Sequence, residues 1–165
     1  NAYASDAATV VIYKGIVQYA RSDAEIAMVI AHEMAHHIAN HIRESQNSQA
    51  VGAIIGGVAM TLLLGDAVAY SGQVIADGMQ IGAAAGALTF SRKQEMEADY
   101  LSAYIISRAG FDLDAGRGIL VKLGRMSGRT TSTVLDTHPA GPERLAAWDL
   151  AAAEIRSGSP MPRKR

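Results

Sequence analysis

The pattern of apolar and polar positions predicts one strand and one long helix in the first third of the chain. Thr9–Val17 is a short run rich in β-branched and aromatic residues, which is typical of a half-buried strand and is the only convincing strand signal. Ser22 and Glu25 have the spacing of a capping box, in which Ser22 accepts from a first-turn amide and Glu25 reaches back. Since no Pro or Gly follows until Gly52, we expect a helix from about Ser22 to about Glu44.

Residues 50–90 differ from the rest of the chain because only two of them, both aspartates, are charged. Their longest strongly apolar stretch, Ala50–Gly65, has 16 residues, fewer than the roughly 20 that a membrane-spanning helix needs. Further on, glycines recur every four positions, which lets two helices approach closely, so we expect a hairpin of packed helices. The alternative is a lid or a peripheral membrane contact, because a long and weakly polar insertion is rarely only structural. The recurring glycines are Gly78, Gly82 and Gly86.

The second half of the chain is predicted to be helical. A second capping box at Ser91–Gln94 begins a helix that ends at Gly110, and Pro142 suits the first turn of the last helix. Together with the strand, these helices give a mainly α domain with a small β-sheet, of class α+β, over residues 1–156. The predicted segments are helices at 91–110, at about 114–126 and at 143–156, a loop at 127–137 and a frayed tail at 157–165.

Composition and charge narrow the function further. The 165 residues carry 15 basic and 16 acidic side chains, and the net charge of −1 argues against a nucleic-acid binder that relies on a basic surface. Cysteine is absent, which excludes disulfides, thiolate zinc ligands and cysteine nucleophiles. The redox compartment stays undetermined, since a chain without thiols is compatible with either regime.

His32, Glu33 and His36 form an H-E-x-x-H motif inside the first predicted helix. Two histidines four residues apart project from one helix face about one turn apart, so both imidazoles can bind a single Zn²⁺. Glu33 lies to the side, where it can take a proton from the attacking water while the metal polarises the scissile carbonyl. These residues predict metal-assisted peptide hydrolysis. A helix with solvated histidines is the alternative, which the apolar residues around the motif make weaker.

A catalytic zinc site needs a third protein ligand and an open position. A metzincin is excluded, because Ile42 stands where that class has its third histidine and Ala39 replaces its glycine. Glu95 and Asp99 lie four residues apart on a later predicted helix, so that Glu95 can bind the metal while Asp99 accepts the free ring N–H of a ligating histidine. Glu97 points the other way and is expected to be a surface charge. The competing interpretation is an acid-rich helix start with no ligand.

Two further histidine features are ambiguous from the sequence alone. His37 and His41 form a second pair four residues apart, which is more typical of a polar helix edge because no base or third ligand accompanies it. His138 precedes Pro139, so it is expected at the end of a loop, where its side chain can reach a cleft. An ordinary histidine at the start of a helix fits that position equally well.

These motifs resemble those of the HtpX-like and CAAX-prenyl-protease-like zinc metallopeptidases, which are gluzincins, and within them the soluble periplasmic BepA-like and mitochondrial OMA-like branches. The resemblance follows the family's order and spans nearly the whole chain. The matching segments are Asn1–Ala4, the strand into Lys14–Gly15, His32–His36, Glu95–Asp99, and Thr137–Pro139 with Arg144.

The resemblance implies one zinc ion per chain and assigns roles to the residues of these motifs. His138 is implied to approach the metal as a fourth ligand that blocks the water, or to help bind the transition state, and Arg144 is implied to lie close to the site and to take part in catalysis. The other implied roles are zinc ligation by His32, His36 and Glu95, general-base catalysis by Glu33, and support of a ligand by Asp99.

We therefore expect a zinc-dependent metalloendopeptidase acting on misfolded or envelope proteins, in the bacterial periplasm or on the periplasmic side of a membrane. An extended substrate can pair with the edge of the strand at 9–17. In the family a strand and a helix usually precede the segment that begins at Asn1, so we expect a catalytic core that associates with such an N-terminal segment. The alternative function is a zinc-binding chaperone or scaffold, whose site His138 closes.

Overall fold

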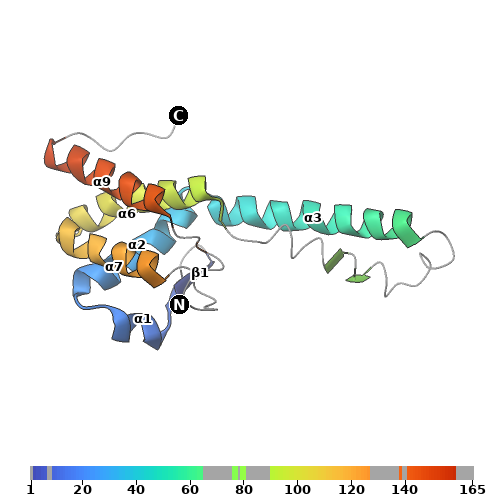
Figure 1. Cartoon of the computed structure of the whole chain (residues 1–165), viewed down its shortest axis with the longest axis horizontal. Helices are drawn as coiled ribbons and strands as arrows, with labels where there is room; N and C mark the ends of the chain where they lie inside the picture. Colours follow the sequence, from blue (N-terminus) through green and yellow to red (C-terminus); the bar gives the residue numbers. More distant parts are fainter. Residues whose placement is uncertain are drawn as a thin grey trace. The chain divides into compact units, whose positions relative to one another are not determined.

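The computed structural model describes residues 2–6, 9–64, 76–77, 79–80, 90–126, 138 and 141–158. They form a mainly helical chain with one small sheet, as the sequence predicts (Figure 1). The chain divides into two compact units, one made of residues 1–39 and 90–165 and the other of residues 40–89. The elements are β1 (Ala2–Asp6), β2 (Thr9–Ile12), α1 (Lys14–Tyr19), α2 (Asp23–Ile38), α3 (His41–Leu64), α6 (Arg92–Arg108), α7 (Leu113–Met126) and α9 (Pro142–Arg156).

The sheet is antiparallel and consists of β1 and β2, with Tyr3 opposite Val11. The predicted strand at 9–17 is therefore too long, because β2 ends at Ile12 and the chain turns directly into α1. Ile16 is the buried residue of that short helix, so the apolar run after residue 12 follows one helix turn rather than a strand face. The sequence prediction also missed β1, whose Ala-Tyr-Ala-Ser-Asp composition has a weak strand propensity.

The first long helix is shorter than predicted, because α2 ends at Ile38 and α3 begins at His41. The chain breaks at Asn40, whose φ of 63° is a left-handed conformation that Asn adopts more readily than most residues. At the start of α2, Ser22 accepts from the Glu25 amide as predicted. The Glu25 carboxylate, however, accepts from the Arg21 amide and does not complete the predicted box with the Ser22 backbone.

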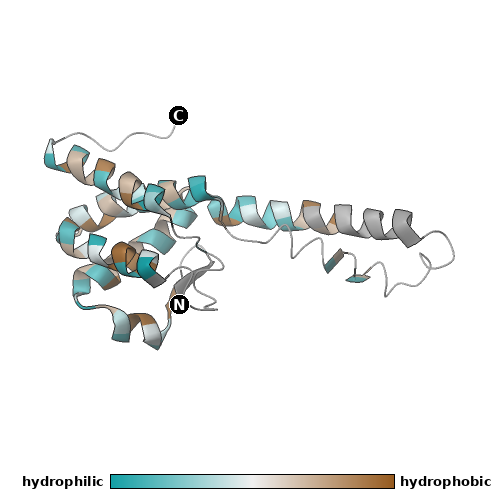
Figure 2. Ribbon diagram, in the orientation of Figure 1, coloured by the Kyte–Doolittle hydropathy of each residue, from teal (hydrophilic) through white to brown (hydrophobic). Residues whose placement is uncertain are grey.

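The helix that follows the break, α3, belongs to the second unit. Its first turns are polar up to Gln49, as the hydropathy colouring shows (Figure 2). No helix among the residues that the structure describes is both long and apolar enough to cross a membrane. The predicted hairpin of packed helices remains a prediction, because its recurring glycines lie outside the described residues.

The later helices agree with the sequence predictions. Ser91 and Gln94 form a complete capping box at the start of α6, which ends just before Gly110 with its φ of +83°. Pro142 lies in the first turn of α9. The predicted loop at 127–137 and most of the predicted tail lie outside the described residues.

The core of the first unit lies between α2, α6, α7 and α9. Helix α2 packs against α6 and α7, and α9 packs against α6. Trp148, Met28, Ile106 and Ile119 are almost completely buried in this core. A Cβ atom at Gly116 would lie 2.6 Å from the Ile106 Cδ1 atom, so α7 approaches α6 as closely as a glycine allows.

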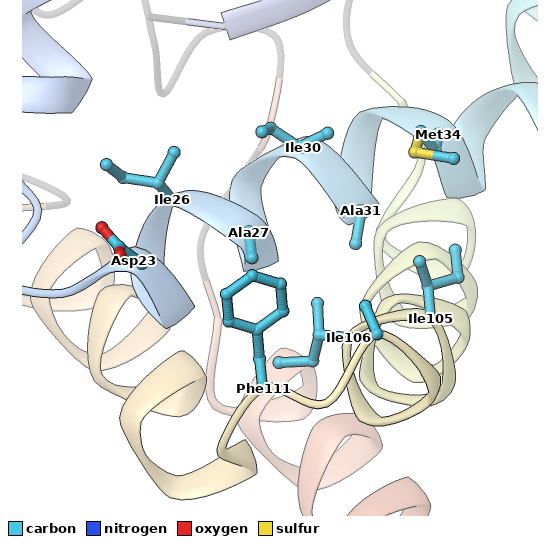
Figure 3. A pocket seen from close by; sticks show the side chains of 10 residues that line it. Asp23, Ile26, Ala27, Ile30, Ala31, Met34, Ile105, Ile106 and Phe111 are labelled. Carbon is cyan, nitrogen blue, oxygen red and sulfur yellow. The ribbon is translucent and has the colours of Figure 1, made fainter.

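An apolar pocket of about 520 Å³ lies between α2, from Asp23 to Met34, and the C-terminal end of α6 (Figure 3). Ile26, Ile30 and Met34 line it from α2, and Ile105 and Phe111 close it from the other side. The two helices therefore run antiparallel in this unit, and the C-terminal half of α2 meets the N-terminal half of α6.

Candidate metal centre

Helix α2 places the H-E-x-x-H motif on its buried face. His32 and His36 lie one turn apart and are both buried, and Glu33 is buried beside them. Met34, between the two histidines, is 42% exposed, which shows how sharply the helix separates its two faces. The predicted arrangement of the two imidazoles on one face is confirmed by these positions.

Helix α6 brings the two predicted acidic residues to the same place. The capping box fixes the first turn of α6, which contains Glu95, and Asp99 follows one turn later. Both side chains are completely buried. Asp99 Oδ1 lies 2.9 Å from His32 Nδ1, the ring nitrogen that faces away from the other donors. Glu97 is half-buried, so it is less exposed than predicted.

Four donor atoms converge between α2, α6 and the chain at residue 138. His32 Nε2 lies 3.1 Å from His36 Nε2 and 3.4 Å from Glu95 Oε2, and His36 Nε2 lies 3.3 Å from Glu95 Oε1. The Nδ1 atom of His138 is 3.3 Å from His32 Nε2 and 2.9 Å from Glu95 Oε1. All four residues are buried, and one donor atom from each lies within 4.8 Å of the others.

These distances fit a tetrahedral zinc ion. Nitrogen and oxygen ligands at about 2.0–2.1 Å from zinc are about 3.3–3.4 Å from one another in a tetrahedron, close to the separations found here. Three imidazoles and a carboxylate are also a donor set that zinc prefers. His32, His36, Glu95 and His138 are thus the residues that would hold the ion.

Buried Arg144 on α9 holds the acidic part of the cluster. Its Nε and Nη2 atoms donate to the two carboxylate oxygens of Asp99 at 2.6 and 2.9 Å, and Nη1 lies 2.8 Å from Glu95 Oε2. Burial opposes ionisation of Asp99, but the hydrogen bonds and charges of Arg144 and His32 together outweigh it and lower the pKa of this carboxyl. Burial also opposes the charge on Glu95, whereas hydrogen bonds from the three histidines lower its pKa.

The net charge of the buried cluster is negative and would be balanced by a divalent cation. Glu33, Glu95 and Asp99 are three buried carboxylates, and Arg144 is the buried cation beside them. With the histidines neutral, as zinc ligation requires, three carboxylates against one guanidinium leave two negative charges, which Zn²⁺ would balance. This balance and the donor geometry both indicate that the residues fit a zinc ion.

The two motif histidines lie in different electrostatic surroundings. Burial disfavours a charge on both rings, but Asp99 and Glu95 overcome it at His32 and raise its pKa to about 9. At His36 burial dominates and lowers the pKa to about 3. Without a metal, His32 therefore favours its protonated form, and His36 stays neutral with a lone pair available for a ligand.

The remaining predicted residues lie as follows. Glu33 Oε1 is 3.5 Å from His138 Nε2, so the predicted base stands at the edge of the donor cluster. His37 lies in the last turn of α2 and His41 begins α3, so they do not form a pair on one helix. Neither belongs to a metal-binding group among the residues that the structure describes.

The sequence prediction missed one residue at this centre, Phe90. Its ring stacks on the His36 imidazole with centroids 3.7 Å apart and planes 23° apart. An aromatic residue directly before the Ser91 capping box was the available signal, because the residue before an N-cap often packs against the first turn.

The fold and the centre are those of a gluzincin-type zinc metallopeptidase, in which one helix supplies two histidines and another supplies a glutamate. Peptidase family M48 matches residues 1–151, and the chain belongs to this family, whose members are zinc-dependent metallopeptidases.

The curated relatives include proteins of two names. The Mitochondrial metalloendopeptidase OMA1 of Arabidopsis thaliana is 33% identical over 144 residues, which is 87% of this chain and 28% of the relative. The Beta-barrel assembly-enhancing protease of Escherichia coli (strain K12) is 30% identical over 161 residues, which is 94% of this chain and 33% of the relative. The chain thus spans about a third of the length of these two relatives.

Proposed function

We propose that this chain is the catalytic part of a zinc-dependent endopeptidase that hydrolyses peptide bonds of protein substrates. The observation that carries the proposal is the buried convergence of His32, His36, Glu95 and His138, with donor separations that fit zinc and Glu33 beside them. Membership of family M48 supports the same function.

In this proposal His32, His36 and Glu95 hold the ion, which when bound lowers the pKa of water and polarises the scissile carbonyl. Asp99 Oδ1 lies 2.9 Å from His32 Nδ1, where it favours a proton on this nitrogen and so the tautomer that directs Nε2 to the metal. Arg144 has 7% of its surface exposed, which leaves it little contact with a substrate. Its role is to position the carboxylates of Glu95 and Asp99.

Glu33 is the general base. Its carboxylate lies on the same helix turn as the histidines but stays outside the group of four donor atoms, so it is free to accept a proton from the attacking water. It then delivers this proton to the leaving amine of the cleaved peptide.

His138 is proposed as a reversible fourth ligand. Its Nδ1 lies 3.3 Å from His32 Nε2 and 2.9 Å from Glu95 Oε1, so with an ion bound it would take the position that water needs. Departure of His138 would open that position, and its imidazole would then be available to bind a substrate group. The same observation supports a second candidate function, a zinc-binding chaperone or scaffold in which His138 never leaves.

The finer parts of the proposal concern substrate and location. We propose protein substrates of the cell envelope and a periplasmic location, because the relatives include beta-barrel assembly-enhancing proteases. Residues 50–90 are proposed to contact a membrane surface peripherally, since only two of them are charged. In the β1–β2 sheet, β1 makes the larger contact with α2. The edge of the sheet formed by β2 is therefore proposed to pair with an extended substrate.

Two substitutions separate chemistry from metal binding. Glu33→Gln should lower hydrolysis of a denatured protein by about 10²–10⁴-fold while one zinc per chain remains bound. Glu95→Ala should lose both the zinc and the activity. The matched control is Glu97→Gln on the same helix, which should retain both. Metal content by mass spectrometry and peptide release measure the two properties, and equal activity in Glu33→Gln would disprove the mechanism.

His138→Ala decides between the two candidate functions. A peptidase held closed by His138 should keep its zinc and become more active when this ligand is removed. A scaffold should keep its zinc and remain inactive against the same substrate.

A further inference from the structure

The position of Phe90 is set by the start of α6. In a capping box the residue before the N-cap and the fourth helical residue lie on the same side of the helix. Here the N-cap is Ser91 and the fourth helical residue is Glu95, so Phe90 is held on the side from which Glu95 reaches the donor cluster. In many helices this pair is apolar and fixes the direction of the chain. In this chain the pair consists of Phe90 and Glu95. Glu95 is a proposed zinc ligand, and Phe90 contacts a second proposed ligand, His36.

Phe90 contacts the histidines of the donor cluster rather than the apolar core. Besides its stacking on His36, the ring lies with its centroid 5.3 Å from that of His138, at an angle of 39°. Phe90 is half-buried and is not part of the apolar core around Trp148. It therefore forms a wall of the metal centre.

The two motif histidines differ in what fixes their rings. The ring of a histidine rotates broadly about its second side-chain torsion, so a ligating imidazole needs a neighbour that fixes its plane. At His32 that neighbour is the Asp99 carboxylate, 2.9 Å from Nδ1. At His36 a flat aromatic ring covers one face of the imidazole.

We propose that Phe90 is a positioning residue that fixes the plane of the His36 imidazole by stacking on it, so that Nε2 points at the metal. The inference rests on the proposed function, because it assigns His36 as a zinc ligand. A carboxylate beside one ligand and an aromatic ring on the other orient the pair without placing a further charge in the buried cluster. Aromatic pairs in such contact contribute beyond the area that they bury.

Three substitutions of Phe90 separate stacking from filling of space. Phe90→Tyr keeps the flat ring, Phe90→Leu keeps apolar volume without a ring, and Phe90→Ala removes both. Phe111→Ala is the matched control, because Phe111 is the other phenylalanine of the chain and lines the apolar pocket instead. Zinc affinity is measured by competition with a chromophoric chelator on the full chain. The visible absorption spectrum of bound Co²⁺ reports the coordination geometry independently of activity.

Loss of a residue that orients a ligand typically weakens metal affinity by about 10–100-fold, and we expect this for Phe90→Ala and Phe90→Leu, with a changed Co²⁺ spectrum. Phe90→Tyr and Phe111→Ala should bind zinc like the wild type. If Phe90→Leu matches the wild type in affinity and spectrum, stacking is not required and the inference is overturned while the proposed function stands. A wild-type chain that binds no zinc would overturn both.

Discussion

The two halves of the antiparallel pair formed by α2 and α6 differ in the side chains that they bring together. In one half, the C-terminal turns of α2 and the first turns of α6 bring His32, Glu95 and Asp99 together in a buried polar cluster. In the other half, Ile30 of α2 and Ile105 of α6 both line an apolar pocket (Figure 3). One pair of helices thus contains both the chemical centre and the packing that supports it.

The difference shows what each half needs to be stable. Apolar packing is favourable without any ligand, because it removes surface from water. A buried cluster with an excess of carboxylates is favourable only when cations balance it, and Arg144 supplies one of them. The polar half should therefore depend on metal, and the apolar half should not. Three substitutions test this comparison.

The largest effect is expected for Arg144→Met, which removes the guanidinium from the polar half. It leaves Asp99 and Glu95 without their buried cation, and we expect a loss of about 3–5 kcal/mol in the free energy of unfolding when zinc is chelated. Excess zinc should recover part of the loss, because an ion that binds only the folded state stabilises it. Urea unfolding with chelator and with zinc measures both values.

Arg117→Met is the control for this substitution. Arg117 on α7 also donates bidentate hydrogen bonds to a carboxylate, that of Asp149, but this pair is largely exposed to solvent. Its loss should cost at most about 1 kcal/mol, and zinc should not change that cost. Equal losses for the two arginines, with no response to zinc, would show that the cluster does not depend on charge balance.

A smaller effect is expected for Asp99→Asn, which keeps the shape of the side chain but removes its charge. The amide oxygen can still accept from His32 Nδ1, but without the negative charge it orients the ring more weakly, so zinc affinity should fall by about 10–100-fold. Competition with a chelator measures the affinity. Asp149→Asn, at the exposed pair, should leave it unchanged, and an unaltered affinity in Asp99→Asn would rule out an orienting role for this carboxylate.

The smallest effect is expected in the apolar half. Ile106→Val removes a buried methyl group close to Gly116, and should lower the free energy of unfolding by about 0.5–1.5 kcal/mol. Because the change lies in the apolar half, zinc affinity should stay within about twofold of the wild type, below the change seen for metal-orienting residues. A marked loss of zinc affinity would show that the two halves are coupled.

The ligands on α2 and α6 could be predicted because helical periodicity alone sets their geometry. His32 with His36, and Glu95 with Asp99, are pairs four residues apart, and each pair lies on one face of its helix as expected. The convergence of the two helices is a tertiary contact, and the sequence alone indicated it only through the known motif. His138 lies 43 residues after Glu95, and no local pattern determines where such a residue packs.

The errors in the predicted fold also have physical causes. Asn40 interrupts the helix although it is neither Gly nor Pro, because Asn tolerates the left-handed conformation that the break requires. The strand β1 exists through pairing with β2, which strand propensity does not capture. Phe90 was missed because its contact with His36 joins residues that are far apart in the sequence.

The break at Asn40 has an electrostatic consequence for the centre. It ends α2 directly after Ile38, so the negative end of the helix macrodipole lies within one turn of His36, where it favours a cation. Helix α6 begins one turn before Glu95 and presents its positive end to that carboxylate. If α2 continued through α3, its negative end would lie about seven turns further along the chain. One residue in the left-handed conformation thus contributes to the preference of this site for a positive ion.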